Sequence, residues 1–358
     1  MGMPQDVHEW PHGHLYSKEI KSMATELNTI RFKTLFADRD ESVAHSKEHP
    51  AAFSPPSSTN KLAIEEPLEI RLEYWTNGVP QHKSVSITMR TPGHDLELAA
   101  GFLFTEGIIA GWNDIKQIRP CGPIVEGQKF QNILRVKLHS TVSVKTETMD
   151  RNFYTTSSCG ICGKTSIEAL KINNQFGQTI KNLASPSVTQ DMLFCLPERM
   201  AAEQQLFQKT GGCHASGLFD EKGTLLCVRE DVGRHNALDK VLGWALINNH
   251  LPLHHHVVLV SGRASFELMQ KASMGGIPFV AAVGAPSTLA VQMAQEFNIT
   301  LVGFLDHQRM TVYHDSGRIQ AHQAQQLEDT GGRTTRQTGS PVNTDVGNPD
   351  RRFSRPST

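Results

Sequence analysis

The 358-residue sequence predicts an α/β protein (α+β overall), in which a sheet covered by helices on both sides follows a smaller α+β unit. Three observations support this prediction. The runs 257–260, 277–283 and 299–304 are almost entirely apolar, which is typical of strands buried on both faces. Helical patterns separate these runs, as they do in α/β folds. Earlier in the chain, 68–74 and 84–89 alternate apolar and polar residues around an Asn-Gly pair, which predicts a β-hairpin.

The first part of the chain divides into a tail and a small domain. Residues 1–60, rich in His, Ser, Lys and Glu, are predicted to be disordered, apart from a weak helical patch at 20–36. Residues 61–148 form the predicted α+β domain. After the hairpin, a run opened by acidic residues places apolar side chains on one face and predicts a helix ending at Gly107. The further strands predicted in this domain are 115–118 and 132–138.

Residues 149–322 form the predicted second domain, and residues 323–358 are expected to be a disordered tail. Pro197 is expected to open a helix that ends at Gly211, because proline favours helix starts and glycine favours helix ends. Ser287 is expected to cap another helix. The other elements predicted there are strands at 213–219 and 224–229, a helix over 237–245 and a last strand at 310–314.

Charge and cysteine content exclude several functional classes. The net charge of −1 offers no basic field for nucleic acid or for an anionic membrane. The sequence has no apolar run of about eighteen residues and no signal-peptide pattern at its start, so we expect a cytoplasmic protein. Six cysteines in so long a chain do not indicate a disulfide framework, and a close pair is more often catalytic or metal-binding.

Cys159 and Cys162 form such a pair, in the sequence Ser-Ser-Cys-Gly-Ile-Cys-Gly. The glycines let the backbone turn tightly and let a bulky partner approach either sulfur. Lys164 and a predicted helix start follow, and both favour a thiolate over a thiol. The loop is therefore suited to sulfur chemistry or to a metal. Cys195 and Cys227 lie in apolar stretches and are expected to be small buried hydrophobic residues.

Polar residues gather where strands meet helices in the second domain. Ligands of open α/β sheets bind where such loops meet, beside helix N-termini. Arg234, Arg263 and Arg309 suit a phosphate or pyrophosphate, because guanidinium groups match its oxygen atoms. His235, at a predicted helix start, has a better claim to a role than His214. The junctions concerned are 210–214, 229–236, 261–263 and 284–287.

Taken together, these motifs resemble those of formate dehydrogenase accessory proteins of the FdhD type. The resemblance covers about 61–320, in order, and leaves out both tails. Its longest segment reads Glu-Asp-Val-Gly-Arg-His-Asn-Ala-Leu-Asp-Lys, and this length makes the resemblance specific. The segments that carry it are 158–163, 210–215, 230–240 and 261–267.

The resemblance implies a sulfurtransferase that takes persulfide sulfur from a cysteine desulfurase and passes it to a molybdenum cofactor. This cofactor is the bis-molybdopterin guanine dinucleotide of formate dehydrogenase, which needs the sulfur for activity. The resemblance also implies a homodimer and a three-layer core like that of cytidine deaminases, with no metal or permanently bound cofactor. The active thiols map onto Cys159 and Cys162. The residues expected to contact the cofactor are Phe304, Leu305, Asp306, His307, Gln308, Arg309, Arg234, His235 and Arg263.

Three alternative functions use the same cysteine pair. A structural zinc site would combine Cys159 and Cys162 with Cys213 and His214. Cys213 is, however, expected to be a buried strand cysteine. A thiol–disulfide oxidoreductase would need a thioredoxin-like βαβ start before the pair, and none is present. A zinc nucleobase deaminase would need a proline where Ser158 stands and a His-x-Glu motif before the loop. Neither is present in the predicted folded region, so the sequence does not favour deaminase activity even if the fold is shared.

Overall fold

The computed structural model describes residues 29–33, 59–124, 130–144 and 186–320, and the statements below concern these residues. The chain divides into two compact units, Met1–His322 and Gln323–Thr358, and the described residues all belong to the first. Among them, no helix has both the length and the apolar character needed to cross a membrane.

The smaller of the two main sheets has four strands in the order β4-β3-β6-β5. The predicted hairpin is confirmed: β3 and β4 pair antiparallel, and Asn77 and Gly78 at the turn have φ values of 51° and 77°. The predicted helix is also confirmed as α2 (Asp95–Thr105), whose apolar side chains pack on one face of this sheet. The strands are β3 (Glu66–Thr76), β4 (Val79–Arg90), β5 (Ile115–Ile124) and β6 (Gln131–Leu138).

The larger sheet has six strands in the order β13-β12-β11-β10-β8-β9. Its central strands β10, β11 and β12 run parallel, and antiparallel strands flank them on both sides. The carboxyl ends of three neighbouring strands therefore meet at one edge of the sheet. The strands are β8 (His214–Asp220), β9 (Leu225–Asp231), β10 (His256–Val260), β11 (Phe279–Ala282), β12 (Thr300–Gly303) and β13 (Thr311–His314).

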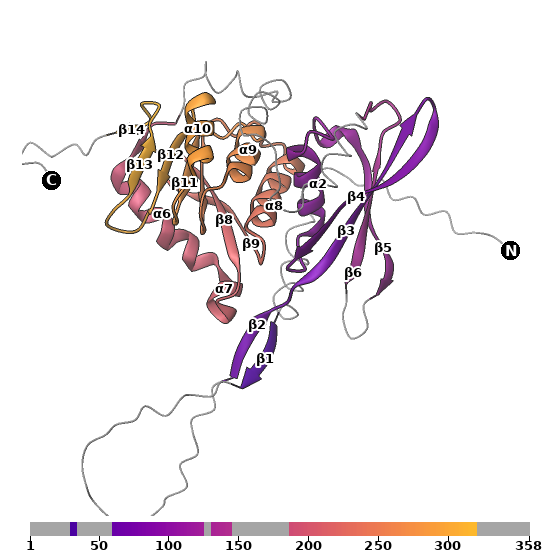
Figure 1. Ribbon diagram of the computed structural model, residues 1–358, viewed down its shortest axis with the longest axis horizontal. Helices are drawn as coiled ribbons and strands as arrows, with labels where there is room; N and C mark the ends of the chain where they lie inside the picture. Colours follow the sequence, from indigo (N-terminus) through magenta and orange to yellow (C-terminus); the bar gives the residue numbers. More distant parts are fainter. Residues whose placement is uncertain (1–28, 34–58, 125–129, 145–185, 321–358) are drawn as a thin grey trace, which may run out of the picture. The chain divides into compact units, whose positions relative to one another are not determined.

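Helices cover both faces of the larger sheet, as predicted (Figure 1). Apolar side chains of α8, α9 and α10 fill the core on one face, and those of α6 fill the core on the other. Ser287 caps α10 as expected, because its hydroxyl accepts a hydrogen bond from the Ala290 amide. The helices are α6 (Gln190–Glu203), α7 (Gln205–Thr210), α8 (Arg234–Ile247), α9 (Phe266–Met274) and α10 (Thr288–Glu296).

The expected start of a helix at Pro197 is wrong. The helix α6 begins at Gln190, where the Thr189 hydroxyl accepts a hydrogen bond from the Met192 amide, and Pro197 lies inside it. Proline removes one helical hydrogen bond, but the buried face of the helix, with Leu193, Leu196 and Met200, packs against the sheet and offsets this loss.

Cys195 is exposed, which corrects the expectation that it is buried. It lies on the side of α6 away from the buried face, since helix faces repeat with a period of 3.6 residues. Cys227 on β9 is buried, as expected.

Part of the N-terminal region forms a strand rather than a weak helix. Strand β1 (Thr29–Lys33) pairs antiparallel with β2 (Thr59–Ala63), and the two make a separate two-stranded sheet. A second two-stranded sheet pairs β7 (Val188–Thr189) with β14 (Ile319–Gln320). The partners in both sheets are far apart in the sequence, so local patterns do not reveal them.

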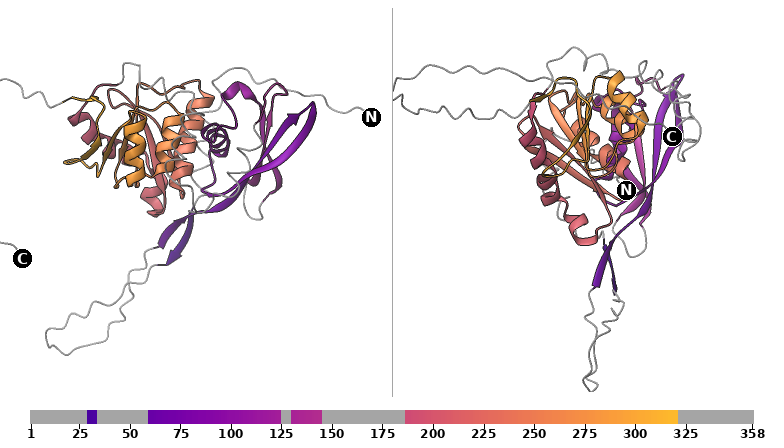
Figure 2. Two further views of the ribbon diagram at one scale, coloured as in Figure 1. Left: turned by 45° about the horizontal axis from the view of Figure 1, so that its top comes forward. Right: turned by 60° about the vertical axis from the view of Figure 1, so that its left-hand side comes forward.

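Helices α2 and α8 join the two main sheets through a very close contact (Figure 2). A Cβ atom built on Gly101 would lie 1.9 Å from the Asp239 carbonyl oxygen, and one built on Gly243 would lie 1.8 Å from that of Glu97. Only glycine at both positions lets the backbones approach this closely. Beside this crossing, the buried Lys271 ammonium of α9 contacts the Asp239 carboxylate at 3.0 Å and the Glu106 carboxylate at 3.1 Å.

Gly243→Ala should destabilise the protein, because its methyl group would overlap backbone atoms of α2 that cannot move independently. Overpacking of this kind costs about 1–3 kcal/mol or more. The matched control is Gly111→Ala, since a Cβ at Gly111 meets nothing within 4 Å and the residue has an extended φ of −169°. Chemical denaturation should show a loss only for Gly243→Ala. Equal stability of the two variants would contradict the proposed role of the crossing.

Candidate functional site

A buried carboxylate organises the turn between β9 and α8. Asp231 and Lys240 have side-chain exposures of 0% and 1%, and the Lys240 ammonium lies 2.6 Å from the Asp231 carboxylate. The same carboxylate accepts hydrogen bonds from the amides of Gly233 (2.8 Å) and Thr91 (3.2 Å) and from the side chain of Asn236 (3.1 Å). Because buried charge is stable only when it is paired and fully hydrogen-bonded, this arrangement fixes the turn.

The same cluster attaches the turn to the end of the small sheet. The Lys240 ammonium donates to the carbonyl of Thr91 (3.0 Å), whose hydroxyl accepts from the Val232 amide (3.1 Å). The Asn236 side chain donates to the Met89 carbonyl at 2.7 Å. Helix α8 therefore begins at Arg234 in a defined position. The side chains of Arg234 and His235 take no part in the hydrogen bonds of the cluster.

The loops that follow β10, β11 and β12 lie in contact with one another at the edge of the larger sheet. The Gly284 amide donates to the Gly262 carbonyl (3.0 Å), and the Phe304 amide donates to the Gly284 carbonyl (3.2 Å). A Cβ on Gly284 would lie 3.0 Å from the Arg263 amide nitrogen. The sequence placed Arg263 and Phe304 at strand ends, and the structure brings their backbones together.

His214 and Arg234 approach the same loops. A Cβ on Gly262 would lie 3.3 Å from the His214 ring and 3.9 Å from Cδ of Arg234. The Ser261 hydroxyl lies 3.4 Å from Nδ1 of His214 and accepts from the Ala215 amide at 2.9 Å. Sequence reasoning left His214 out of the predicted site. Its position beside Cys213 gave no indication that its ring lies near Arg234, because this proximity brings the start of β8 close to the start of α8.

The charges at this edge favour an anion. Arg234 has a buried Nε atom that finds no hydrogen-bond partner in the described part of the chain. Arg263 is exposed and forms no ion pair with another described residue. Burial lowers the pKa of His214, and the neighbouring Arg234 guanidinium lowers it further. The arginines are thus the permanent cations of this site, and guanidinium groups bind phosphates or carboxylates in paired hydrogen bonds.

His235 lies next to Arg234 as a neutral base. Burial, together with the charges of Arg234 and Lys271, lowers its pKa from an ordinary value of 6.5 to about 4. Its Nε2 atom lies 3.3 Å from the Ser265 hydroxyl and 3.9 Å from the Glu267 carboxylate. At neutral pH it therefore contributes a hydrogen-bonding ring rather than a charge.

The predicted cofactor segment 304–309 is divided by its burial. Phe304 has a positive φ of 50° and is 45% exposed, whereas Leu305 is buried in the core between the sheet and α6. Asp306 accepts hydrogen bonds from the Gln308 and Arg309 amides, both at 2.8 Å, and these lower its pKa. The exposed Arg309 guanidinium pairs with the same Asp306 carboxylate at 3.0 Å. Its expected place beside Arg234 and Arg263 stays a prediction.

The thiol pair Cys159 and Cys162 lies outside the described residues. Cys213 is buried, as expected, and its sulfur lies 3.8 Å from the Thr91 hydroxyl. Burial raises the pKa of the Cys213 thiol to about 11, so this residue does not favour a thiolate ligand for a metal. Within the described ranges, no three His, Cys, Asp or Glu side chains lie close enough together to hold a metal ion.

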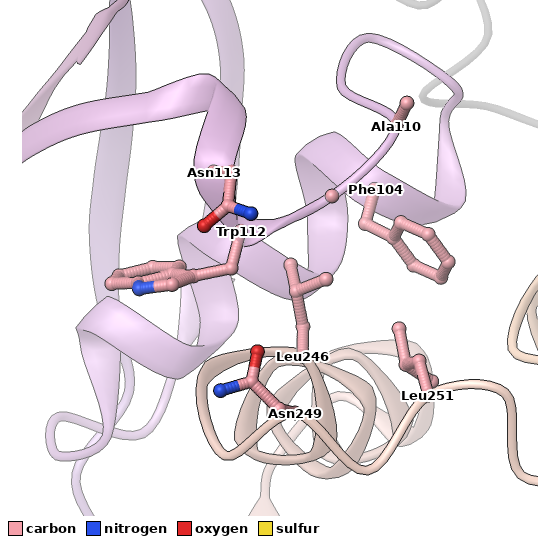
Figure 3. A pocket seen from close by; sticks show the side chains of 8 residues that line it. Phe104, Ala110, Trp112, Asn113, Leu246, Asn249 and Leu251 are labelled. Carbon is pink, nitrogen blue, oxygen red and sulfur yellow. The ribbon is translucent and has the colours of Figure 1, made fainter. Parts of the chain in front are cut away.

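Two hollows lie away from this edge. The first, of about 230 Å³, lies between Trp112 and Asn113 of the short helix η1 (Trp112–Asp114) and Leu246 and Asn249 at the end of α8 (Figure 3). The second, of about 420 Å³, is lined by residues of β9, of α7 and of the connection 91–94. No predicted site residue lines either hollow, so the candidate site is the loop edge itself.

Comparison with known proteins gives consistent matches. Residues 63–320 match the model of the FdhD/NarQ family. The chain is 51% identical over 259 residues to the sulfur carrier protein FdhD of Streptomyces coelicolor, covering 72% of this chain and 88% of the relative. The corresponding protein of Mycolicibacterium paratuberculosis is 50% identical, with 72% and 91% covered.

The fold also has a solved counterpart. A crystal structure of a proposed formate dehydrogenase accessory protein from Desulfotalea psychrophila is similar, with a TM-score of 0.56 and 22% identity. The similarity covers 82% of this chain and all of the other. At this identity it concerns the fold, which supports the α/β assignment. A likeness to cytidine deaminases stays a prediction.

The titration of His235 tests the electrostatics of this edge. NMR of the full chain should place its midpoint near pH 4, because burial and Arg234 oppose protonation. Since the unfolded chain binds the proton first, this residue should reduce stability as the pH falls from about 6.5 to about 4. Arg234→Gln should raise the midpoint, and the distant Lys222→Gln should leave it unchanged. A midpoint at or above 6.5 in the wild type would contradict the arrangement.

Proposed function

The chain belongs to the FdhD/NarQ family, and on that basis we propose that it is a sulfur carrier and sulfurtransferase that serves a formate dehydrogenase. The observation that carries the proposal is its 51% identity over 259 residues to a curated sulfur carrier protein. The cysteine loop lies inside the matched range 63–320. No thiol pair elsewhere in the sequence has comparable spacing.

The sulfur donor is a cysteine desulfurase that carries a persulfide. A thiolate at Cys159 or Cys162 attacks the outer sulfur of this persulfide, and the donor's own sulfur leaves as a thiolate. One S–S bond forms and one breaks, so the exchange needs no external oxidant or reductant. Both Lys164 and the predicted helix start favour the attacking thiolate. The product is a persulfide on this chain.

The sulfur acceptor is the molybdenum cofactor of formate dehydrogenase, bound as a substrate in its bis-molybdopterin guanine dinucleotide form. Arg234 and Arg263 are suited to its phosphates, because both offer guanidinium donors that no described residue neutralises. Neutral His235 and the hydroxyl of Ser265 supply further hydrogen bonds at the same edge. Phe304 adds an exposed aromatic ring on the neighbouring loop.

We place this activity in the cytoplasm and assign it to a homodimer, as the resemblance to the family implies. Cytoplasmic desulfurases and a reducing environment keep thiols available for persulfide chemistry. No resident metal or cofactor takes part in this proposal.

Sulfur loading tests the thiol pair directly. After incubation with a desulfurase and cysteine, the intact mass should rise by about one sulfur atom. The double variant Cys159→Ala, Cys162→Ala should lose this gain, because the attacking thiolate is gone. The matched control is Cys195→Ala, which removes an exposed cysteine on α6 and should load normally. Unchanged loading in the double variant would contradict the assignment.

Guanosine diphosphate tests the acceptor site separately, because it resembles half of the cofactor's tail. Calorimetry should show binding to the wild type and to Cys159→Ala. Arg263→Ala should bind about tenfold more weakly or worse, since a charge-assisted contact contributes roughly 1.5–3 kcal/mol. Lys222→Ala, in the turn between β8 and β9, is the control. Absence of binding to well-folded wild type would contradict an acceptor site at this edge.

A further inference from the structure

The small sheet has a second face, opposite α2, that carries a row of three arginines. Leu134 pairs with Ile70, and both are buried on the α2 side. Residues one position along therefore point to the other side. In the register, Arg71 pairs with Arg135, and Arg135 pairs with Arg119. The three arginines thus lie side by side on β3, β6 and β5.

Such a row is unfavourable in the isolated chain. Neighbouring strands lie about 4.8 Å apart, so the three side chains start within about 10 Å of one another. Like charges directly opposite each other destabilise a sheet. Of the three, Arg71 is the only one that forms an ion pair with another described residue, the Glu69 carboxylate, at 2.7–2.8 Å. Neither Arg119 nor Arg135 forms an ion pair with another residue in the described part of the chain. Two positive charges on this face are left for a ligand.

An aliphatic patch adjoins the arginine row on the same face. Ile87 and Met89 on the edge strand β4 are 57% and 47% exposed, and Ile124 on the opposite edge strand β5 is 67% exposed, with β3 and β6 between them. Glu69 on β3 pairs with Ile87 on β4 and with Ile133 on β6. These residues form a row across the sheet that is parallel to the arginine row and two residues away from it along β3. Exposed aliphatic side chains spread across one sheet face beside polar ones mark a surface that binds another molecule. We call this face, with its arginine row and aliphatic patch, the outer face.

We propose that the outer face docks a partner protein through a segment that combines carboxylates with aliphatic side chains. The carboxylates would pair with Arg119 and Arg135, and the aliphatic side chains would cover Ile87, Met89 and Ile124. The patch itself is aliphatic, and the Trp75 ring that the alternation of β3 places on the same face is half-buried and lies 5.2 Å from the Lys137 ammonium, so it offers little free surface on which a base could stack. Among the described residues of this face, a second copy of the chain offers no free carboxylate. Glu69 is bound to Arg71, and Glu73 is bound to Lys137 at 2.5 Å.

The probe for this surface is a labelled synthetic peptide of alternating leucine and glutamate, titrated with the full chain by fluorescence anisotropy. Wild type should bind it, and the affinity should fall as salt is added, since exposed charges are screened. Arg135→Gln and Ile87→Ser should each weaken binding by about fivefold or more. Lys222→Gln, which removes a cation far along the chain from this sheet, should bind as wild type. A leucine–lysine peptide should not bind.

Stability measurements separate docking from folding. Arg135→Gln should melt close to the wild-type temperature, because the like-charge contacts it removes offset the loss of its attraction to Glu73. Three results would overturn the proposal. The first is equal affinity of all variants for the peptide. The second is tighter binding of a single-stranded oligonucleotide or a phosphatidylserine vesicle, with the same dependence on Arg135. The third is a dimeric wild type whose Ile87→Ser variant is a monomer. None of these results depends on sulfur loading, so the outer face is tested independently of the proposed function.

Discussion

The buried ion pair between Asp231 and Lys240 is the interaction on which the arrangement of the site depends. The Asp231 carboxylate pairs with the Lys240 ammonium and accepts hydrogen bonds from two backbone amides and one side-chain amide. The Lys240 ammonium also donates hydrogen bonds to two backbone carbonyls. Removing either partner of a buried pair leaves an uncompensated charge, which costs about 3–5 kcal/mol. The pair therefore commits the chain to one path from β9 into α8 and places Thr91 against it. Without that path, Arg234 would have no defined position relative to Gly262.

The longest motif of the sequence divides into two groups of residues with different tasks. Asp231, Asn236 and Lys240 are buried and hydrogen-bonded to the protein itself. Between them, Arg234 and His235 are only partly buried and face the loop edge. A single stretch of chain thus contains both a structural anchor and the groups it presents. Many polar residues follow one another there because the buried ones fix the backbone from which Arg234 and His235 reach the loop edge.

Local patterns predicted most of the elements, and contacts between distant residues account for what they missed. The hairpin follows from Asn77 and Gly78, and the start of α10 follows from Ser287, because turns and caps act over a few residues. The helix start predicted at Pro197 is wrong because the burial of Leu193 and Met200 outweighs the preference of proline for the first turn of a helix. The loop edge was expected from strand ends, but the approach of His214 to Arg234 joins residues twenty positions apart and follows from no spacing. The thiol pair itself lies outside the described residues, so only its sequence supports it.

The glycine crossing of α2 and α8 has a consequence for the order in which the protein is made. The core on the α2 side of the small sheet also contains Leu246 of α8 and Met274 of α9, so it is incomplete when residues 61–148 leave the ribosome. At 5–20 residues per second, the roughly 100 residues up to the end of α8 need about 5–20 s more. During that interval the nascent chain exposes one side of α2, because the part of α8 that packs against Gly101 has not yet been made. Exposed apolar surface of this kind is what chaperones of nascent chains recognise, so α2 is the segment that such a chaperone would cover.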